Sequence, residues 1–287
     1  MKLPKALLPL IEDGIIDGVL SQLRSGKEAT VYVVDCGGKR RCAKVYKEAE
    51  KRSFRHAAIY REGRKTRGSR DSRAEGRRSR HGRRVQEAEW KSTESDALYL
   101  LQAAGVRVPK PYGLFEGVLL MELICDEDGF PAPRLNEVDM SPEQAVEWHG
   151  FMIEQIVRML CAGTVHGDLS EYNLLLDTQG PVIIDLPQAV QVSGNNNAFA
   201  LLERDVSNMR ALFGHFAPEL LQTRYAQEMW ALYLKGELHP SSVLTGRFKE
   251  STKRANVGAV LDQIDEARWE HEAREAGRKA AEEDETD

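Results

Sequence analysis

Three polar residues between positions 166 and 185 have the types and the spacing needed to act on a metal-bound triphosphate. Asp168 and Asn173 lie five residues apart in the segment HGDLSEYN, and Asp185 follows the apolar run VII. An aspartate can accept the proton of an attacking hydroxyl, and an amide with a second carboxylate can hold Mg²⁺ or Mn²⁺ through hard oxygen ligands. These are the minimum functional groups for transferring a phosphoryl group from ATP, a reaction that depends mostly on positioning and charge stabilisation.

The residues around these three predict a β-hairpin. Apolar runs at 174–176 and 182–184 flank a turn at 177–180, which is the pattern of two short strands. Because Asp185 directly follows the second run, we expect its side chain at the open end of the hairpin, beside the loop that carries Asp168. The plainer alternative is a buried hairpin whose polar residues only make turns. The spacing H-G-D-x-x-x-x-N, followed by Ile-Asp, favours the catalytic interpretation.

A second group of candidates lies in the N-terminal half, where a turn of small residues joins two predicted strands. Ser25 and Lys27 belong to this turn, in the segment SGKEATVYVV, and Lys44 lies inside the next strand, at 42–46. Backbone N–H groups of such a turn can contact phosphates, and a strand lysine can reach the α- and β-phosphates. The turn matches neither GxGxxG nor the Walker A pattern. A solvated turn lysine and an exposed strand lysine therefore remain the alternatives.

The elements that follow are expected to complete a small β-rich lobe. A helix is predicted at 85–104, and Glu94 on it could pair with the strand lysine, the alternative being an ordinary surface glutamate. The apolar strand VLLMELI should end at a hinge between two lobes, where the backbone of Glu122 and Ile124 could bind the edge of an adenine.

The C-terminal half is predicted to be mainly helical. Ser141 is suited to cap a helix that runs to about residue 160, and further helical patterns lie at 199–216, 218–235 and 251–281. The expected fold is α+β, with two lobes arranged as in a protein kinase. Its parts would be an N-terminal helix at 1–20, a β-rich lobe with one main helix at 21–124, a basic flexible insertion within it at 47–84, a helical lobe at 125–250, and an acidic helical tail at 251–287.

Charge is distributed unevenly along the chain, whose net charge is −5. Residues 47–84 contain fifteen lysines and arginines against five acids, and residues 265–287 contain ten acids against four bases. With almost no aliphatic residues, the basic segment cannot bury enough apolar surface to fold alone. It is either a solvated linker or an arm for RNA or another polyanion, and binding of that kind would depend strongly on salt.

Composition excludes several classes of protein. The chain has 287 residues, and no apolar run approaches the roughly 20 residues that span a bilayer. Its four cysteines show no CxxC spacing, so neither a zinc site nor a disulfide framework is indicated. We therefore expect a cytoplasmic globular protein that does not bind membranes.

The ordered set of motifs resembles the RIO family of atypical protein kinases. The resemblance covers about residues 5–250 and rests on SGKEATVY, AKVYK, WKSTE, VPKPYG, LLMELI, HGDLSEYN and IIDLPQ. With about twenty residues before the first strand, the branch without an N-terminal winged helix is expected. The resemblance implies roles for the candidates: Ser25 and Lys27 on the phosphate loop, Lys44 on the α- and β-phosphates, Glu94 orienting that lysine, Asp168 as catalytic base, and Asn173 with Asp185 as metal ligands.

Two departures from ordinary protein kinases affect the expected mechanism. Gly167 stands where an arginine usually receives the activation-loop phosphate, and Ser170 stands where a phosphate-contacting lysine usually lies. Control by an activation loop is therefore not expected. The resemblance permits a serine/threonine kinase that acts mainly as an ATPase, with Asp185 as a possible phosphate acceptor that forms an aspartyl-phosphate.

Two other functions use the same residues. One is a small-molecule kinase of the aminoglycoside or choline type, which the segments SEY and LPQ disfavour. The other is a nucleotide-gated ribosome-assembly or RNA-binding factor, which the basic segment supports. A protein substrate, a ribosomal particle and RNA are thus all candidate partners beside ATP.

Overall fold

The computed structural model describes residues 3–47 and 80–249, and of residues 80–91 it describes only the backbone. The chain divides into two units, Met1–Arg247 and Phe248–Asp287, and every described helix and strand belongs to the first. Most of the expected basic insertion and the whole expected acidic tail lie outside the described residues. Within the described part, no helix is both long enough and apolar enough to cross a membrane.

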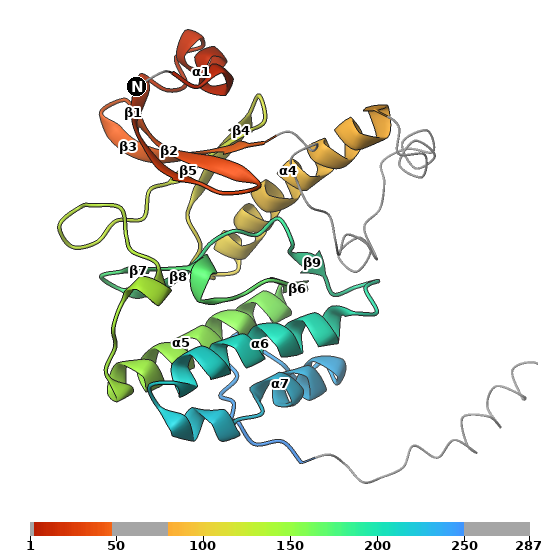
Figure 1. Cartoon of the computed structure of the whole chain (residues 1–287). Coiled ribbons are helices and arrows are strands. Elements are labelled where there is room, and N and C mark those ends of the chain that lie inside the picture. The colour runs from red at the N-terminus through yellow and green to blue at the C-terminus, as the bar shows by residue number, and fades with distance from the viewer. Residues whose placement is uncertain (1–2, 48–79, 250–287) are drawn as a thin grey trace, which may run out of the picture. The chain divides into compact units, whose positions relative to one another are not determined.

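An antiparallel sheet forms the first lobe (Figure 1), with the strand order β1-β2-β3-β5-β4. Gly37 and Gly38 connect β2 to β3 with φ angles of 62° and 75°, the two positive values that a tight hairpin turn requires. In this order β3 lies in the middle of the sheet, between β2 and β5. Its strands are β1 (Gly18–Ser25), β2 (Ala29–Cys36), β3 (Lys39–Tyr46), β4 (Pro111–Phe115) and β5 (Val118–Glu122).

The N-terminal helical segment is shorter than the helix expected at 1–20. It consists of a 3₁₀ turn, Lys5–Leu7, and the helix α1, Leu8–Glu12. Gly14 ends it with a φ of 67° while its N–H donates to the carbonyl of Ile11, as a glycine past a helix C-terminus commonly does. The segment covers part of the sheet, with buried side chains from both (Leu7, Leu10, Ile16, Val34, Ala43, Val118 and Leu120).

The main helix of this lobe, α4, spans Arg80–Ala103 and begins five residues before the expected start at 85. Residues 80–84, expected in the insertion, thus belong to the helix. Leu98 and Leu101 are buried in the core, and Gly105 follows the last turn with a φ of 74°. The helix lies beside the sheet (Figure 1) and carries Glu94 to its buried side.

The second lobe is built on α5 (Pro142–Cys161), α6 (Ala198–Gly214) and α7 (Tyr225–Leu234). Ser141 caps α5 as expected, since its hydroxyl accepts from the N–H of Gln144 at 3.2 Å. The helix expected at 218–235 is interrupted: a 3₁₀ segment, Pro218–Gln222, precedes α7 because Thr223 takes an extended conformation.

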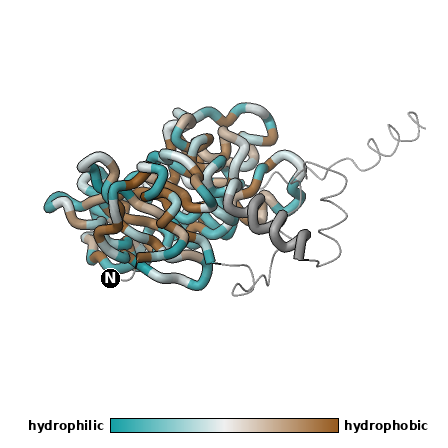
Figure 2. Tube along the Cα trace, turned by 90° about the horizontal axis from the view of Figure 1, so that it is seen from above, coloured by the Kyte–Doolittle hydropathy of each residue, from teal (hydrophilic) through white to brown (hydrophobic). Residues whose placement is uncertain are grey.

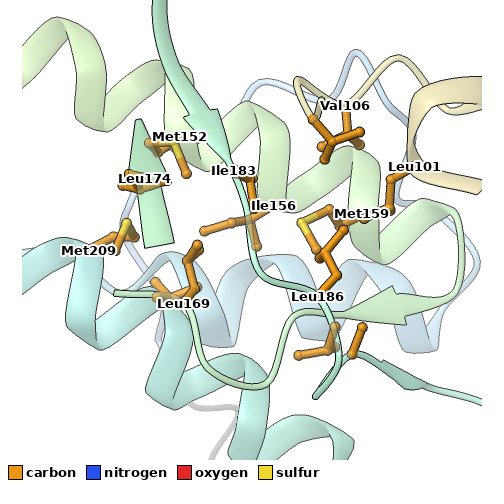
Figure 3. Close-up of a cluster of buried hydrophobic side chains, with 14 of the residues drawn as sticks. Leu101, Val106, Met152, Ile156, Met159, Leu169, Leu174, Ile183, Leu186 and Met209 are labelled. Carbon is orange, nitrogen blue, oxygen red and sulfur yellow. The ribbon is translucent and has the colours of Figure 1, made fainter. Parts of the chain in front are cut away.

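Two short strand pairs lie between the sheet and α5. The hairpin of β7 (Leu174–Asp177) and β8 (Gly180–Ile183) is the one that the sequence predicts, and β6 (Thr164–Val165) pairs with β9 (Val190–Gln191). Side chains from α5, the hairpin and α6 pack together (Figure 3), among them Met152, Ile156, Leu174, Ile183 and Met209. Hydrophobic residues follow the inner segments of the chain and hydrophilic ones its outer loops (Figure 2).

Arg107, in the connection from α4 to β4, holds this connection against the second lobe. Its guanidinium forms an ion pair with Asp177, its N–H donates to Gln155 Oε1 at 2.9 Å, and its carbonyl accepts from the N–H of Ile183 at 2.9 Å. Because backbone and side chain are both engaged, the hairpin is fixed in position beneath the sheet.

His149 on α5 offers a test of the packing of the second lobe. It is 1% exposed against the rings of Phe213 and Tyr225, and its Nε2 has no hydrogen-bond partner among the described residues. Burial lowers the pKa of His149 from 6.5 to about 4. The unfolded chain therefore binds more protons between these values, and stability falls as the pH falls through that window.

We expect His149→Leu to raise the free energy of unfolding by about 1 kcal/mol at pH 8, since an unpaired buried polar group is removed. At pH 5 the gain should be about 2 kcal/mol larger, because the proton-linked cost disappears as well. Urea unfolding at the two pH values measures both quantities. An equal effect at both would show that His149 is not held neutral by the fold.

Candidate active site

A cavity of about 560 Å³ opens between the sheet and the β7–β8 hairpin. The turn at 26–29 and the hinge at 121–124 line it from the first lobe. Most of the residues expected from the sequence to perform chemistry also line it: Lys27, Lys44, Glu94, Glu122, Ile124, Asp168 and Asp185. Two do not line it: Ser25, which is exposed, and Asn173, which is buried.

Lys44 lies between two carboxylates. Its Nζ is 2.6 Å from Glu94 Oε1 and 2.6 Å from Asp185 Oδ1. Burial by itself lowers the pKa of Lys44, but the charges of Asp185 and Glu94 outweigh it, and the pKa is raised above its usual value. The lysine is thus permanently charged, and it links three elements: β3, α4 and the end of β8.

Tyr46 supports Glu94 from the other side, which the sequence analysis did not anticipate. Its hydroxyl donates to Glu94 Oε2 at 2.7 Å, and the ring is buried. Glu94 therefore has a partner for each carboxylate oxygen. The signal in the sequence is the spacing, since residues two apart on a strand, such as Lys44 and Tyr46, face the same side of the sheet.

His166 connects the loop that carries Asp168 to the segment after β8 that carries Asp185. The N–H of Asp168 donates to His166 Nδ1 at 3.2 Å, and His166 Nε2 lies 3.2 Å from the carbonyl of Ile184. Since Nδ1 accepts, the proton of the neutral ring is on Nε2 and is donated to that carbonyl. Burial lowers the pKa of His166 to about 4, which keeps the ring neutral.

Asp205 on α6 holds the same loop through hydrogen bonds to its backbone. Its two carboxylate oxygens accept the N–H groups of Gly167 at 2.7 Å and Leu169 at 3.0 Å, and Asn208 donates to the carbonyl of Leu169 at 2.8 Å. Burial raises the pKa of Asp205 to about 7, against the two backbone hydrogen bonds that favour the carboxylate. We did not identify this residue from the sequence. Its signal is an acid on the core-facing side of an amphipathic helix.

Asp168 is half-buried at the floor of the cavity. Burial raises its pKa, the charge of Arg204 opposes that rise and the charge of Asp185 adds to it. Asn173, at the end of the 3₁₀ turn Glu171–Asn173, donates from Nδ2 to the carbonyl of Asp168 at 2.8 Å. Gln188 donates from Nε2 to Asp168 Oδ2 at 3.4 Å. Gln188 is a further residue that the sequence analysis did not single out as functional.

Asp185 has an unusual backbone conformation. Its φ is 69°, in the left-handed region that residues other than glycine seldom adopt. Burial raises its pKa, but the charge and hydrogen bond of Lys44 outweigh this, and the pKa is lowered. Its side chain is 41% exposed. The carboxylate is therefore ionised and accessible from the cavity while Lys44 holds one of its oxygens.

The turn after β1 is fixed by Lys47, the last residue of the segment AKVYK, to which the sequence analysis gave no role. Lys47 donates from Nζ to Ser25 Oγ at 3.0 Å and also to the carbonyl of Gly26. Ser25 Oγ lies 3.3 Å from Thr30 Oγ1. Ser25 thus shapes the turn through its contacts with Lys47 and Thr30, whereas Lys27 lines the cavity.

Residues 121–124, the hinge between the lobes, line the cavity. The N–H of Glu122 donates to the carbonyl of Lys110 at 2.8 Å, and the carbonyl of Ile124 accepts from Ala132 at 2.9 Å. The N–H of Ile124 has no backbone partner within the described residues. This N–H is available to the acceptor edge of a planar base.

The oxygen donors suit a magnesium ion that is held jointly with phosphates. No group of three or more His, Cys, Asp or Glu side chains able to hold a metal occurs among the described residues. Mg²⁺ bound to a nucleotide needs only one or two protein carboxylates, because phosphates and water supply the other ligands. Asp185 offers such a carboxylate. Asn173 offers its amide oxygen, since its Nδ2 is used by the Asp168 carbonyl.

Comparison with known proteins identifies relatives of the chain. A sequence pattern described as the RIO domain matches residues 30–226. The chain is 39% identical over 210 residues to the RIO-type serine/threonine-protein kinase Rio1 of Haloferax volcanii, covering 72% of this chain and 67% of that protein. It is 30% identical over 226 residues to the human serine/threonine-protein kinase RIO1, covering 76% of this chain. The chain spans only 37% of the length of that human relative.

Two crystal structures of the Rio2 kinase from Chaetomium thermophilum share the fold. One is an ADP/Mg²⁺–phosphoaspartate complex, with a TM-score of 0.54 and 20% identity over 81% of this chain and 74% of that one. The other has a TM-score of 0.57 and 23% identity over 80% of this chain and 72% of that one. The expected α+β, two-lobed, protein-kinase-like fold is confirmed.

The role of Asp205 can be tested by Asp205→Asn. The asparagine side chain has one acceptor oxygen, and its nitrogen can only donate. One of the two buried N–H groups of the loop therefore loses its partner, at a cost of about 1–3 kcal/mol. We expect lower stability in urea and faster hydrogen exchange at Gly167 and Leu169. The exposed Glu237→Gln serves as control. Exchange at both amides that matches the unaltered protein would contradict the anchoring role.

Proposed function

The chain belongs to the RIO family, and from that premise we propose that it is an ATP-dependent phosphotransferase of the serine/threonine kinase type. The observation that carries the proposal is the position of Lys44, fixed by Glu94 and Asp185 in a cavity whose floor is Asp168. A charged lysine, an ionised metal-binding carboxylate and a base in one cavity are the components that phosphoryl transfer needs.

ATP would bind with its adenine at the hinge and its phosphates beneath the turn at 26–29. The N–H of Ile124 and the backbone of Glu122 would contact the base, Lys44 the α- and β-phosphates, and Lys27 the outer phosphates. Asp185 and Asn173 would hold Mg²⁺, which neutralises charge on the phosphates when it is bound. Asp185 can do so because its pKa is lowered and its side chain is open to the cavity.

Asp168 would be the catalytic base. Its pKa is raised by burial, which strengthens the carboxylate as a proton acceptor. The hydroxyl oxygen of the acceptor bonds to the γ-phosphorus, the bond from that phosphorus to ADP breaks, and the hydroxyl proton passes to Asp168. His166 and Asp205 fix the backbone on either side of the base, so that it does not reorganise during the reaction.

Asp185 would also serve as an acceptor of the phosphoryl group. Lys44 holds its Oδ1, which leaves Oδ2 to attack the γ-phosphorus and form an acyl phosphate as ADP departs. Hydrolysis of that acyl phosphate restores the carboxylate. The two steps together make an ATPase cycle that can switch the protein between states.

Membership of the RIO family favours this function over the small-molecule kinase. A protein hydroxyl, a ribosomal particle and RNA remain the candidate partners, and the charge of residues 47–84 supports the last two. That segment lies mostly outside the described residues, so its role stays a proposal.

Two substitutions should affect different quantities, one the rate of ATP turnover and the other the affinity for ATP. Asp168→Asn should slow ATP turnover about 10² to 10⁴-fold with little change in nucleotide affinity, because a base acts mainly in the transition state. Lys44→Met should weaken Mg²⁺-ATP binding about 10- to 100-fold, as charged hydrogen bonds contribute about 1.5–3 kcal/mol. Calorimetric titration and phosphate release measure the two quantities. Asp96→Asn on the exposed side of α4 is the control, and unchanged affinity in Lys44→Met would refute the site.

The covalent step predicts an identifiable product. After incubation with γ-labelled ATP, label on the protein should be removed by hydroxylamine, and borohydride reduction should convert residue 185 to homoserine. Asp185→Asn should retain no such label, whereas a phosphoserine would resist hydroxylamine. If all retained label is stable and maps to serines, the protein is a conventional autophosphorylating kinase and Asp185 is not an acceptor.

A further inference from the structure

Gln188 lines the cavity next to Asp168, the proposed catalytic base. It lies three residues after Asp185 and two before β9, in a turn closed by the hydrogen bond from the N–H of Ala189 to the carbonyl of Leu186 at 3.0 Å. Pro187 restricts the backbone of this turn further. The side chain of Gln188 lines the cavity together with Asp168 and Asp185.

The orientation of the Gln188 amide follows from its partner. An ionised carboxylate only accepts hydrogen bonds, so the NH₂ end of the amide must face Asp168 Oδ2, 3.4 Å away. The carbonyl end, Oε1, accepts no hydrogen bond from any described residue. The pair therefore presents two acceptors to a molecule in the cavity, the carboxylate of Asp168 and the amide oxygen of Gln188.

Two acceptors match water better than an alcohol. Water carries two hydrogens, and a serine or threonine hydroxyl carries one. We propose that Gln188 and Asp168 together hold the water molecule that attacks the phosphoryl group once Asp185 has received it, so that Gln188 is a positioning residue for ATP hydrolysis. The inference rests on the proposed phosphotransferase function and specifies how the phosphoryl group is released.

The reaction balances without any further reactant. The water oxygen forms a bond to the phosphorus of the acyl phosphate, the bond from that phosphorus to Asp185 Oδ2 breaks, and its electron pair stays on the restored Asp185 carboxylate. One water proton passes to Asp168, and the other stays on the phosphate product after being held by Gln188 Oε1. Gln188 takes no proton, and its contribution is to orient the nucleophile.

The test compares Gln188→Met with the unaltered protein. Methionine has nearly the same length and volume but no polar end, and the hydrogen bond it removes is long, so the fold should not change. We expect phosphate release from saturating Mg²⁺-ATP to slow about 10- to 100-fold, with the ATP dissociation constant and the thermal unfolding midpoint unchanged. Gln179→Met, in the exposed turn between β7 and β8, is the matched control and should leave the rate unchanged.

The outcomes separate this inference from the proposed function. If the unaltered protein binds Mg²⁺-ATP but releases no phosphate and labels no acceptor, the proposed function fails, and this inference with it. If the unaltered protein hydrolyses ATP and Gln188→Met does so at a similar rate, only the inference about Gln188 is overturned. A rate loss accompanied by an equal loss of ATP affinity would also overturn it, because Gln188 would then bind nucleotide.

Discussion

The buried ammonium group of Lys44 is the constraint on which the rest of the structure depends. A charge removed from water must be compensated by nearby opposite charges, and here Glu94 and Asp185 each lie 2.6 Å away. These partners come from α4 and from the end of β8, so satisfying one lysine fixes the helix and the hairpin relative to the sheet. Tyr46 completes the arrangement by engaging the second oxygen of Glu94.

Buried polar groups also fix the loop that carries Asp168. Its backbone is held by the neutral ring of His166 on one side and by the carboxylate of Asp205 on the other, and both groups are buried. Only four residues separate Asp185 from β9, so no long segment lies between the carboxylate of Asp185 and the second lobe. That short connection places Gln188 beside Asp168.

The two carboxylates of the cavity have different environments despite their proximity. Burial raises the pKa of Asp168, whereas contact with Lys44 lowers that of Asp185. Groups whose pKa values are moved apart are suited to different tasks. The more basic carboxylate fits proton transfer, and the more acidic one fits metal binding and nucleophilic attack on phosphorus.

Motifs in the sequence were enough to predict the fold class, the hairpin and five of the residues that the structure brings together: Lys44, Glu94, Asp168, Asn173 and Asp185. These lie in local patterns, because strand alternation, helix caps and turn residues act over a few positions. The sequence did not reveal Tyr46, Asp205 or Gln188 as parts of the site, and it made the N-terminal helix too long. Those features depend on which distant groups meet once the core has packed, as when Asp205 reaches Gly167 across 38 residues, and only the tertiary structure decides such contacts.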